Sequence, residues 1–230
     1  MASKDVRIRE HVPLYPMHAV LFPGMLLPAH VRQPGLIEMM DRVLNTREEL
    51  GVVLINRRQS TKTDVRPHTM GTLARIVRME RHPDGTMSVV FQGTQRFRIR
   101  AMEQRHPYLQ ASVESLVEEE TPSVRMEALA AKVRELWHHY RETLQNVAGV
   151  TLGDGDLPHE AVHLAYTVAA NIQSGLSDKQ RLVSQPSVED ILAAEIPLLL
   201  KELRLLEFID ETQEREQELR LGPTGYLSRN

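Results

Sequence analysis

The chain has 230 residues, 41% of them hydrophobic, which is enough to bury a sizeable core in one large domain or two small ones. Its 28 basic and 31 acidic side chains give a formal net charge of -3, without the positive field typical of nucleic-acid-binding proteins. The absence of cysteine excludes disulfides, thiolate zinc sites and cysteine nucleophiles, and it favours a reducing compartment. No apolar run has the length of a signal peptide or a membrane span, so we expect a cytoplasmic protein.

Residues 1–118 show short apolar runs separated by Pro and Gly, with many β-branched residues, which is typical of a compact, mostly β domain. The expected elements are strands over 51–56, 72–79, 87–92, 95–100 and 108–116 and a short helix over 35–46. His82-Pro-Asp-Gly85 suits a tight turn, so the strands on either side of it should form a hairpin.

The segment 95–100 alternates strictly between arginine and other side chains. As a half-solvated strand it would place Phe97 and Ile99 on one face, and on the other Arg96, Arg98 and Arg100. This basic face is the best indication of RNA binding in the chain. Aromatic residues make up only 4% of the sequence, so partners for base stacking are scarce. We therefore favour a solvated face paired with acids such as Glu114 and keep RNA binding as an alternative.

After residue 118 the apolar spacing becomes helical. We expect helices from Thr121-Pro122, from about 156 through 172, and from a cap at Ser187 through 220. Pro197 should bend or interrupt the last of these. Beyond Ile209 the apolar stripe stops, which predicts a solvated helical extension or the beginning of a connector. The second half is thus expected to be a helical bundle over 119–222, followed by a flexible tail over 223–230.

The stretch 12–31, VPLYPMHAVLFPGMLLPAHV, resembles the opening of the amino-terminal domains of Lon proteases, with their Phe-Pro-Gly-Met core between flanking prolines. Three more segments agree with this family in order and spacing: 71–76, 83–85 and 92–99. The helical half is similar more loosely, over 164–170, 178–182 and 199–207. Tyr166 stands where the family usually has Asp, which puts any capping or ion-pair role of that position in doubt.

The resemblance implies an α+β fold in which a mostly-β pseudo-barrel domain of the PUA-like type precedes a helical bundle ending in a long helix. It also implies a protein that binds exposed or unfolded polypeptide segments, as an adaptor or regulator in protein quality control. A complete Lon continues into an ATPase and a Ser-Lys peptidase. Because the chain contains no Gly-x-x-x-x-Gly-Lys-Ser/Thr, we expect a stand-alone, non-catalytic form without a cofactor.

The expected partners are unfolded or hydrophobic polypeptides, together with a full-length Lon or another protease or ATPase. Neither a membrane nor nucleic acid is expected, an RNA-binding PUA-like domain remains the alternative, and the oligomeric state is left open. The candidate contact residues are Phe22, Met25, Leu27 and Tyr108, because they lie at bends or strand starts where apolar groups can reach the surface. Core positions in a β domain would have the same appearance.

His159-Glu-Ala-Val-His163 matches the His-Glu-x-x-His pattern of zinc peptidases. On a helix, His159 and His163 would share one face and Glu160 could act as a base on zinc-bound water. However, the motif follows Pro158 at the start of the expected helix, and any third ligand lies on a separate one. A zinc peptidase is therefore the lesser alternative, and we expect neither a metal nor catalytic residues.

Overall fold

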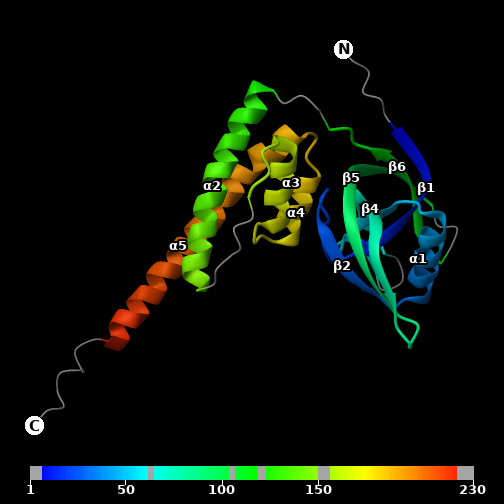
Figure 1. Ribbon diagram of the computed structural model, residues 1–230, viewed down its shortest axis with the longest axis horizontal. Coiled ribbons are helices and arrows are strands. Elements are labelled where there is room, and N and C mark those ends of the chain that lie inside the picture. The colour runs from blue at the N-terminus through cyan, green and yellow to red at the C-terminus, as the bar shows by residue number, and fades with distance from the viewer. Residues whose placement is uncertain (1–6, 62–64, 104–106, 119–122, 150–155, 222–230) are drawn as a thin grey trace, which may run out of the picture.

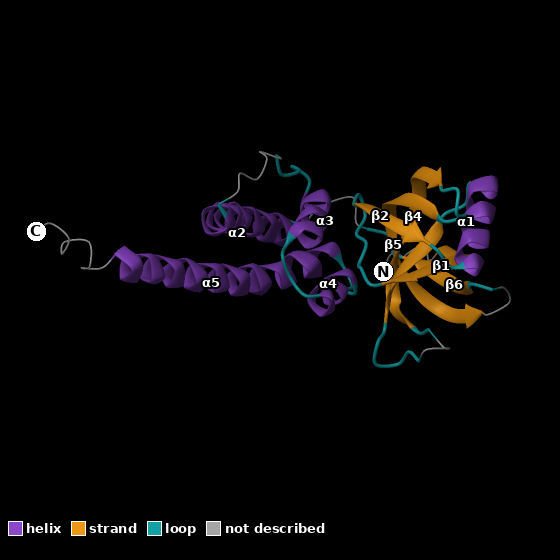
Figure 2. Cartoon of the chain, turned by 90° about the horizontal axis from the view of Figure 1, so that it is seen from below, coloured by secondary structure: helices purple, strands orange, loops and turns teal. Residues whose placement is uncertain are grey.

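The computed structural model describes residues 7–61, 65–103, 107–118, 123–149 and 156–221. They form a β lobe and a helical lobe that lie side by side (Figures 1 and 2). The strands are β1 (Arg7–Met17), β2 (Leu26–Val31), β3 (Leu50–Ile55), β4 (Pro67–Arg81), β5 (Met87–Glu103) and β6 (Leu109–Ser115). The helices are α1 (Pro34–Thr46), α2 (Val124–Ala148), α3 (Ala161–Asn171), α4 (Leu176–Val183) and α5 (Val188–Leu221).

The six strands follow the order β2-β5-β4-β3-β1-β6, and β6 also pairs with β5, which closes five of them into a barrel. All pairs are antiparallel except β1 with β3. The expected strands over 87–92 and 95–100 prove to be a single strand, β5, which pairs with β2 through its first part and with β6 through its last. Helix α1 covers the barrel on the side away from the helical lobe (Figure 2).

The hairpin between β4 and β5 has the turn that its sequence predicts. Gly85 adopts a φ of 83° and donates to the carbonyl of His82 at 3.0 Å, closing the turn. Such a φ is readily adopted only by glycine, so the Pro-Asp-Gly sequence determines the position of the turn. Strand β3, helix α1 and strand β6 also lie where the sequence places them.

Residues 18–25, here termed the crossover, connect β1 to β2 across the end of the barrel that faces the helical lobe. Gly24 has a φ of 79°, and its N–H donates to the Gly93 carbonyl at 2.9 Å. The Gly93 N–H in turn donates to the Met25 carbonyl at 3.0 Å. Thr72 anchors the middle of the segment, because its buried hydroxyl donates to the Leu21 carbonyl at 2.6 Å. The crossover is therefore held against β4 and β5 by specific hydrogen bonds.

Helices α2 and α5 run side by side in the same direction, as both views show. Near their starts Ser123 donates from its hydroxyl to Glu189 at 2.6 Å, and further along His139 lies 3.7 Å from Glu207. A parallel pair needs a long return connection, which α3 and α4 occupy. Pro197 lies inside α5 without ending it. In the described part of the chain no helix combines the length and the apolarity that a membrane span needs.

The boundaries of the helices differ in part from expectation. The cap of α2 is Ser123, whose hydroxyl accepts the Met126 N–H at 3.0 Å, while Thr121, Pro122 and the tail over 223–230 lie outside the described residues. Helix α3 begins at Ala161, later than predicted, and α4 was not expected, because eight residues are too few for a clear helical period. Ser187 does cap α5, accepting the Asp190 N–H at 3.1 Å.

The largest apolar cluster joins the two lobes. It is formed mainly by α2, α3 and α5, but it also includes Val20 and Phe22 of the crossover and Leu54 of β3. Phe22 is fully buried. Burying a side chain of this size stabilises the fold by roughly 1.5–3 kcal/mol, so the crossover fastens the helical lobe to the barrel.

Candidate functional site

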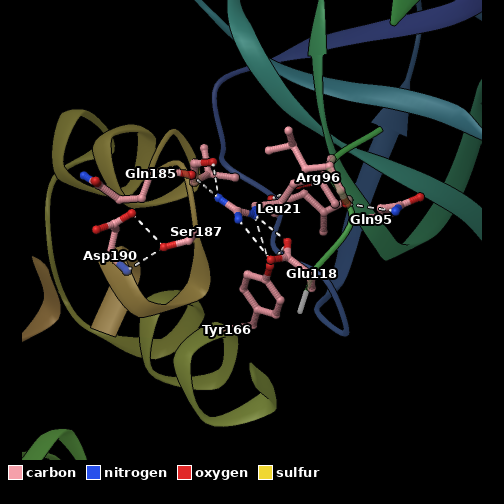
Figure 3. A network of polar contacts seen from close by, with 11 residues as sticks. Leu21, Gln95, Arg96, Glu118, Tyr166, Gln185, Ser187 and Asp190 are labelled. Carbon is pink, nitrogen blue, oxygen red and sulfur yellow. Dashed lines mark hydrogen bonds and ion pairs between the residues drawn. The ribbon is translucent and has the colours of Figure 1, made fainter. Parts of the chain in front are cut away.

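Arg96 of β5 is the polar centre of the interface between the lobes (Figure 3). Its side chain has no exposed surface. The guanidinium donates to both carboxylate oxygens of Glu118 at 3.0 and 3.2 Å and to the hydroxyl of Tyr166 on α3 at 3.0 Å. It also donates at 3.2 Å to the carbonyl of Val183, the last residue of α4, and at 2.5 Å to that of Gln185, two residues further on. One side chain of the barrel thus reaches α3, α4 and the segment before α2.

The charge state of this centre follows from its surroundings. Burial alone would lower the pKa of Arg96, but the Tyr166 hydroxyl and the Glu118 carboxylate beside it outweigh that effect and raise the pKa. Burial also raises the pKa of Tyr166, whose hydroxyl donates to Glu118. Arg96 is therefore cationic and Tyr166 neutral at physiological pH. The ion pair of Arg96 with Glu118 is supported by hydrogen bonds from the Tyr166 hydroxyl to Glu118 and from Arg96 to two backbone carbonyls.

The expectation of a solvated arginine face is wrong for Arg96. The alternation is present, with Phe97 buried in the barrel, but the helical lobe covers the outer face of β5 at Arg96. Arg98 and Arg100 remain exposed further along the strand, and Arg100 pairs with Glu114 as expected. Alternation shows which side chains share a face, but it carries no information about a lobe that packs on that face.

Beside the Arg96 network lies a hollow of about 430 Å³, here termed the α3 cleft. Its lining comes from both lobes: Arg9, Pro23, Gly24, Glu49, Arg75, Thr94, Gln95, Glu118, Val162, His163 and Tyr166. One wall consists of the end of the crossover and β5, and the other is the start of α3. The cleft therefore exists only because the two lobes are docked together.

The charged side chains at the β-lobe edge of the α3 cleft are already paired. Glu49 accepts from Arg9 at 2.5 Å and from Arg75 at 3.2 Å. Burial tends to raise the pKa of Glu49, but hydrogen bonds from Arg9 and Thr94 and the nearby positive charges lower it below its ordinary value. Arg9, Glu49 and Arg75 are therefore engaged with one another at the edge of the cleft. A ligand would contact mainly the apolar residues and the amide of Gln95.

A second hollow, of about 740 Å³, includes His18 of the crossover in its lining and is termed the α4 cleft. Its lining consists of His18, Leu54, Ile55, Asn56, Arg57, Arg58, Gln59, His68, Leu176, Ser177 and Gln180. It too is formed by both lobes, with β3 and the residues after it on one side and the start of α4 on the other.

A third surface belongs to α5 alone. Pro197, Leu200, Leu205 and Phe208 form a shallow apolar hollow with the stems of Lys201 and Arg204. Phe208 is 66% exposed and Leu205 52% exposed. Unlike the two clefts, this surface has no second wall from the β lobe.

The four candidate contact residues fall into two groups. Phe22 and Tyr108 are core residues, with 0% and 6% exposure, and Tyr108 accepts a hydrogen bond from Arg42 at 3.2 Å. Met25 and Leu27 are half-buried and pack against the barrel core. None of the four lines the α3 cleft, whereas their neighbours Pro23 and Gly24 do. Tyr166, Glu118 and Val162 line the cleft but were not proposed from the sequence. For Tyr166 a signal was present, because this residue stands where the resemblance leads us to expect Asp.

The His-Glu-x-x-His pentapeptide does not have the geometry of a zinc site. Glu160 is the N-cap of α3, so His159 precedes the helix and does not sit one helical turn before His163. His163 lies 2.8 Å from Glu160, which occupies its Nδ1 atom. Among the described residues no group of three or more His, Cys, Asp or Glu side chains could hold a metal ion.

Comparisons with known proteins agree with this architecture. The family model for the substrate-binding domain of ATP-dependent protease La (LON) matches residues 11–201, most of the chain. The chain belongs to the Lon substrate-binding domain family. Lon protease 2 of Sorangium cellulosum is 28% identical over 216 residues, covering 91% of this chain and 27% of that protein. Lon protease 2 of Myxococcus xanthus is 29% identical over 204 residues, covering 86% and 24%.

Two solved Lon structures share the fold. The Lon N-terminal domain protein from Xanthomonas campestris has a TM-score of 0.60 at 19% identity, covering 81% of this chain and 96% of that one. The N-terminal domain of the Mycobacterium avium complex Lon protease has a TM-score of 0.56 at 18% identity, covering 85% and 98%. The expected α+β class and the Lon resemblance are thus confirmed. This Lon-family chain spans about a quarter of the length of the curated Lon proteases that it matches.

Proposed function

We propose that the chain binds exposed or unfolded polypeptide segments in the α3 cleft. Membership of a substrate-binding domain family supports a role in substrate binding. We choose this cleft because it lies between the two lobes, with Pro23, Gly24 and Val162 on its walls. Ligand sites favour such concave junctions between packed units.

The chemistry of the α3 cleft suits a peptide chain better than a small charged metabolite. Its apolar wall can receive aliphatic side chains. Thr94 and Gln95 donate to the carbonyls of Leu73 and Leu116, so their side-chain oxygens can accept from peptide N–H groups. The Glu49 carboxylate is paired with both Arg9 and Arg75, so these three charged groups are engaged with one another within the protein. Recognition would therefore rest on apolar contact and backbone hydrogen bonds, which are common to most unfolded sequences.

The Arg96 network makes the cleft rigid before a ligand arrives. Because Arg96 connects β5 to Tyr166 and to the end of α4, the two walls are held in one arrangement. A preformed site avoids the entropic cost of ordering the protein on binding. We further propose that the chain acts in protein quality control as an adaptor or regulator, holding substrate without cleaving it.

The experiment is a fluorescence anisotropy titration with a labelled, permanently unfolded polypeptide, comparing the natural chain with Val162→Glu. A charge on the apolar wall should weaken binding about tenfold, equivalent to about 1.4 kcal/mol. The matched control is Val124→Glu, which adds the same charge at a residue that is 90% exposed and outside the cleft. Denaturant unfolding of both variants verifies that the fold is retained.

Three further measurements separate this function from its rivals. Stronger binding to a structured RNA than to the polypeptide would favour the RNA-binding alternative. Cleavage of casein that a chelator abolishes would favour the zinc peptidase. Loss of polypeptide binding in Phe208→Glu, with Val162→Glu unaffected, would move the site to the outer face of α5.

A further inference from the structure

The α4 cleft has an unusual balance of charge. Two arginines and two histidines contribute to its lining, namely His18, Arg57, Arg58 and His68, together with the polar groups of Asn56, Gln59, Ser177 and Gln180. No aspartate or glutamate is among its lining residues in the described part of the chain. The chain as a whole carries more acidic than basic residues, so a pocket of this composition departs from the average surface.

The two arginines of this cleft are available to a ligand. Within the part of the chain that the structure describes, neither Arg57 nor Arg58 forms an ion pair, whereas Arg9 and Arg75 at the α3 cleft share Glu49. Adjacent cations without a counter-charge repel each other, and an anion placed between them relieves that repulsion.

The arginines lie on a defined turn. Asn56 donates its N–H to the Arg66 carbonyl at 2.8 Å, and its own carbonyl accepts from Gln59 and Ser60 at 3.1 and 2.9 Å. The Asn56 side chain accepts the Arg58 N–H at 3.2 Å. The backbone of Arg57 and Arg58 is therefore held in place beside the cleft. This lowers the entropic cost of ordering the two arginines when a ligand binds.

The opposite wall is the first turn of α4. Leu176 and Ser177 begin this helix, and Gln180 is anchored by donating to the Met70 carbonyl at 3.1 Å. The same turn carries Asp178, whose carboxylate offsets the partial positive charge of the helix end and pairs with Arg181 and Lys201, so the positive charge of the cleft comes from its arginines. Burial lowers the pKa of His68, so near neutral pH its imidazole contributes a hydrogen bond and no charge.

We propose that the α4 cleft binds carboxylate groups of an acidic polypeptide segment, making this chain prefer substrates that carry Asp or Glu beside apolar residues. The polypeptide nature of the ligand rests on the proposed function, while the preference for anions rests on the lining itself. Leu54, Ile55 and Leu176 supply apolar contacts next to the cations. Arginine pairs with carboxylates through two parallel hydrogen bonds, which gives both affinity and geometric selectivity.

RNA is the less suitable anion for this cleft. Single-stranded bases bind chiefly by stacking on large aromatic rings, and the lining within the described residues contains no Phe, Tyr or Trp. The apolar residues that are present are aliphatic, which suits side chains of a peptide. A structured RNA is nevertheless included as a competitor in the test.

The test uses the full chain and two labelled short peptides with the same apolar residues, one carrying Asp and Glu and the other Asn and Gln at the same positions. We expect the acidic peptide to bind about tenfold more tightly at physiological salt, with an advantage that shrinks as salt increases. The double variant Arg57→Gln, Arg58→Gln should abolish that advantage. Arg98→Gln, at an exposed arginine of β5 outside the cleft, should retain it.

A second measurement separates failure of this inference from failure of the proposed function. An oligoglutamate peptide without apolar residues is titrated while the backbone NMR signals of the cleft residues, 18, 54–59, 68 and 176–180, are followed. Shifts confined to these segments support the carboxylate site even if no unfolded polypeptide binds the α3 cleft. Equal affinities for the two labelled peptides, or shifts elsewhere, would overturn the inference. It would also be overturned if inorganic phosphate or structured RNA displaced oligoglutamate at lower concentration than the acidic peptide does.

Discussion

Arg96 and Glu118 form a two-point ion pair between the barrel and the segment that leads into the helical lobe, with N–O distances of 3.0 and 3.2 Å. Arg96 is fully buried, whereas the side chain of Glu118 keeps 22% exposure. The pair therefore has one desolvated partner whose charge must be matched inside the protein. Every other acceptor around Arg96 comes from the helical lobe, so lobe docking and charge burial depend on each other.

Arg96→Met should destabilise the chain by about 3–5 kcal/mol, because it leaves Glu118 without its counter-charge and two carbonyls without their donor. The measurement is the free energy of unfolding in denaturant at neutral pH. Arg98→Met, on an exposed arginine two residues along the same strand, should change it by no more than about 0.5 kcal/mol. Equal effects of the two changes would show that the buried network contributes little.

Tyr166→Phe should cost about 2 kcal/mol at pH 7, because it removes a hydroxyl that bonds to two charged groups while keeping the ring. Burial raises the pKa of Tyr166 above its ordinary value of 10.0. The folded chain therefore keeps the hydroxyl protonated where the unfolded chain loses its proton, so the contribution of Tyr166 to stability falls as pH rises beyond 10.0. Unfolding free energies of the natural chain and the variant should converge there, and a constant difference would contradict this account.

Gly93→Ala should destabilise the chain by about 3 kcal/mol or more, because its Cβ would lie 2.2 Å from the Phe22 carbonyl oxygen. The crossover would have to move, and the wall of the α3 cleft would move with it. Thermal unfolding and the polypeptide titration should therefore both respond. Gly175→Ala is the control, since no atom lies within 4 Å of its added Cβ, and it should have a small effect on both.

Glu195 of α5 is fully buried, and neither carboxyl oxygen makes a hydrogen bond of normal geometry within the described residues. Burial raises its pKa well above the ordinary 4.5, while the backbone at Ala169 opposes this less strongly. As pH rises above 4.5 the unfolded chain releases this proton and the folded chain retains it, so stability falls up to the folded pKa.

Glu195→Met should therefore stabilise the chain at neutral pH by about 1–3 kcal/mol, with a smaller gain near pH 4.5. Denaturant unfolding across this pH range measures the difference. Glu211→Met, at a glutamate with 65% exposure, should show no comparable dependence on pH. A destabilised Glu195→Met variant at neutral pH would indicate that the carboxylate is ionised and paired in the folded chain.

Elements with a strong local signal were predictable from the sequence. The hairpin turn depends on Gly85, the cap of α5 on Ser187, and β3 on one continuous apolar run, and each of these is decided within a few residues. The Lon resemblance came from the Pro and Gly spacing of the crossover, which is also local. Helix α4 and the late start of α3 were missed, because short helices without a clear period depend on the neighbours that they pack against.

The sequence by itself determined the two-part α+β organisation, the Lon family and the alternation of β5. Each of these depends on the spacing of residues within single segments of the chain. Only the tertiary structure decided that Arg96 is buried, that Phe22 belongs to a core shared by both lobes, and that Arg57 and Arg58 line a cleft with α4. The physical reason is that burial and charge pairing depend on groups far apart in the chain. Tyr166 and Arg96 are 70 residues apart, and no local pattern predicts that they meet.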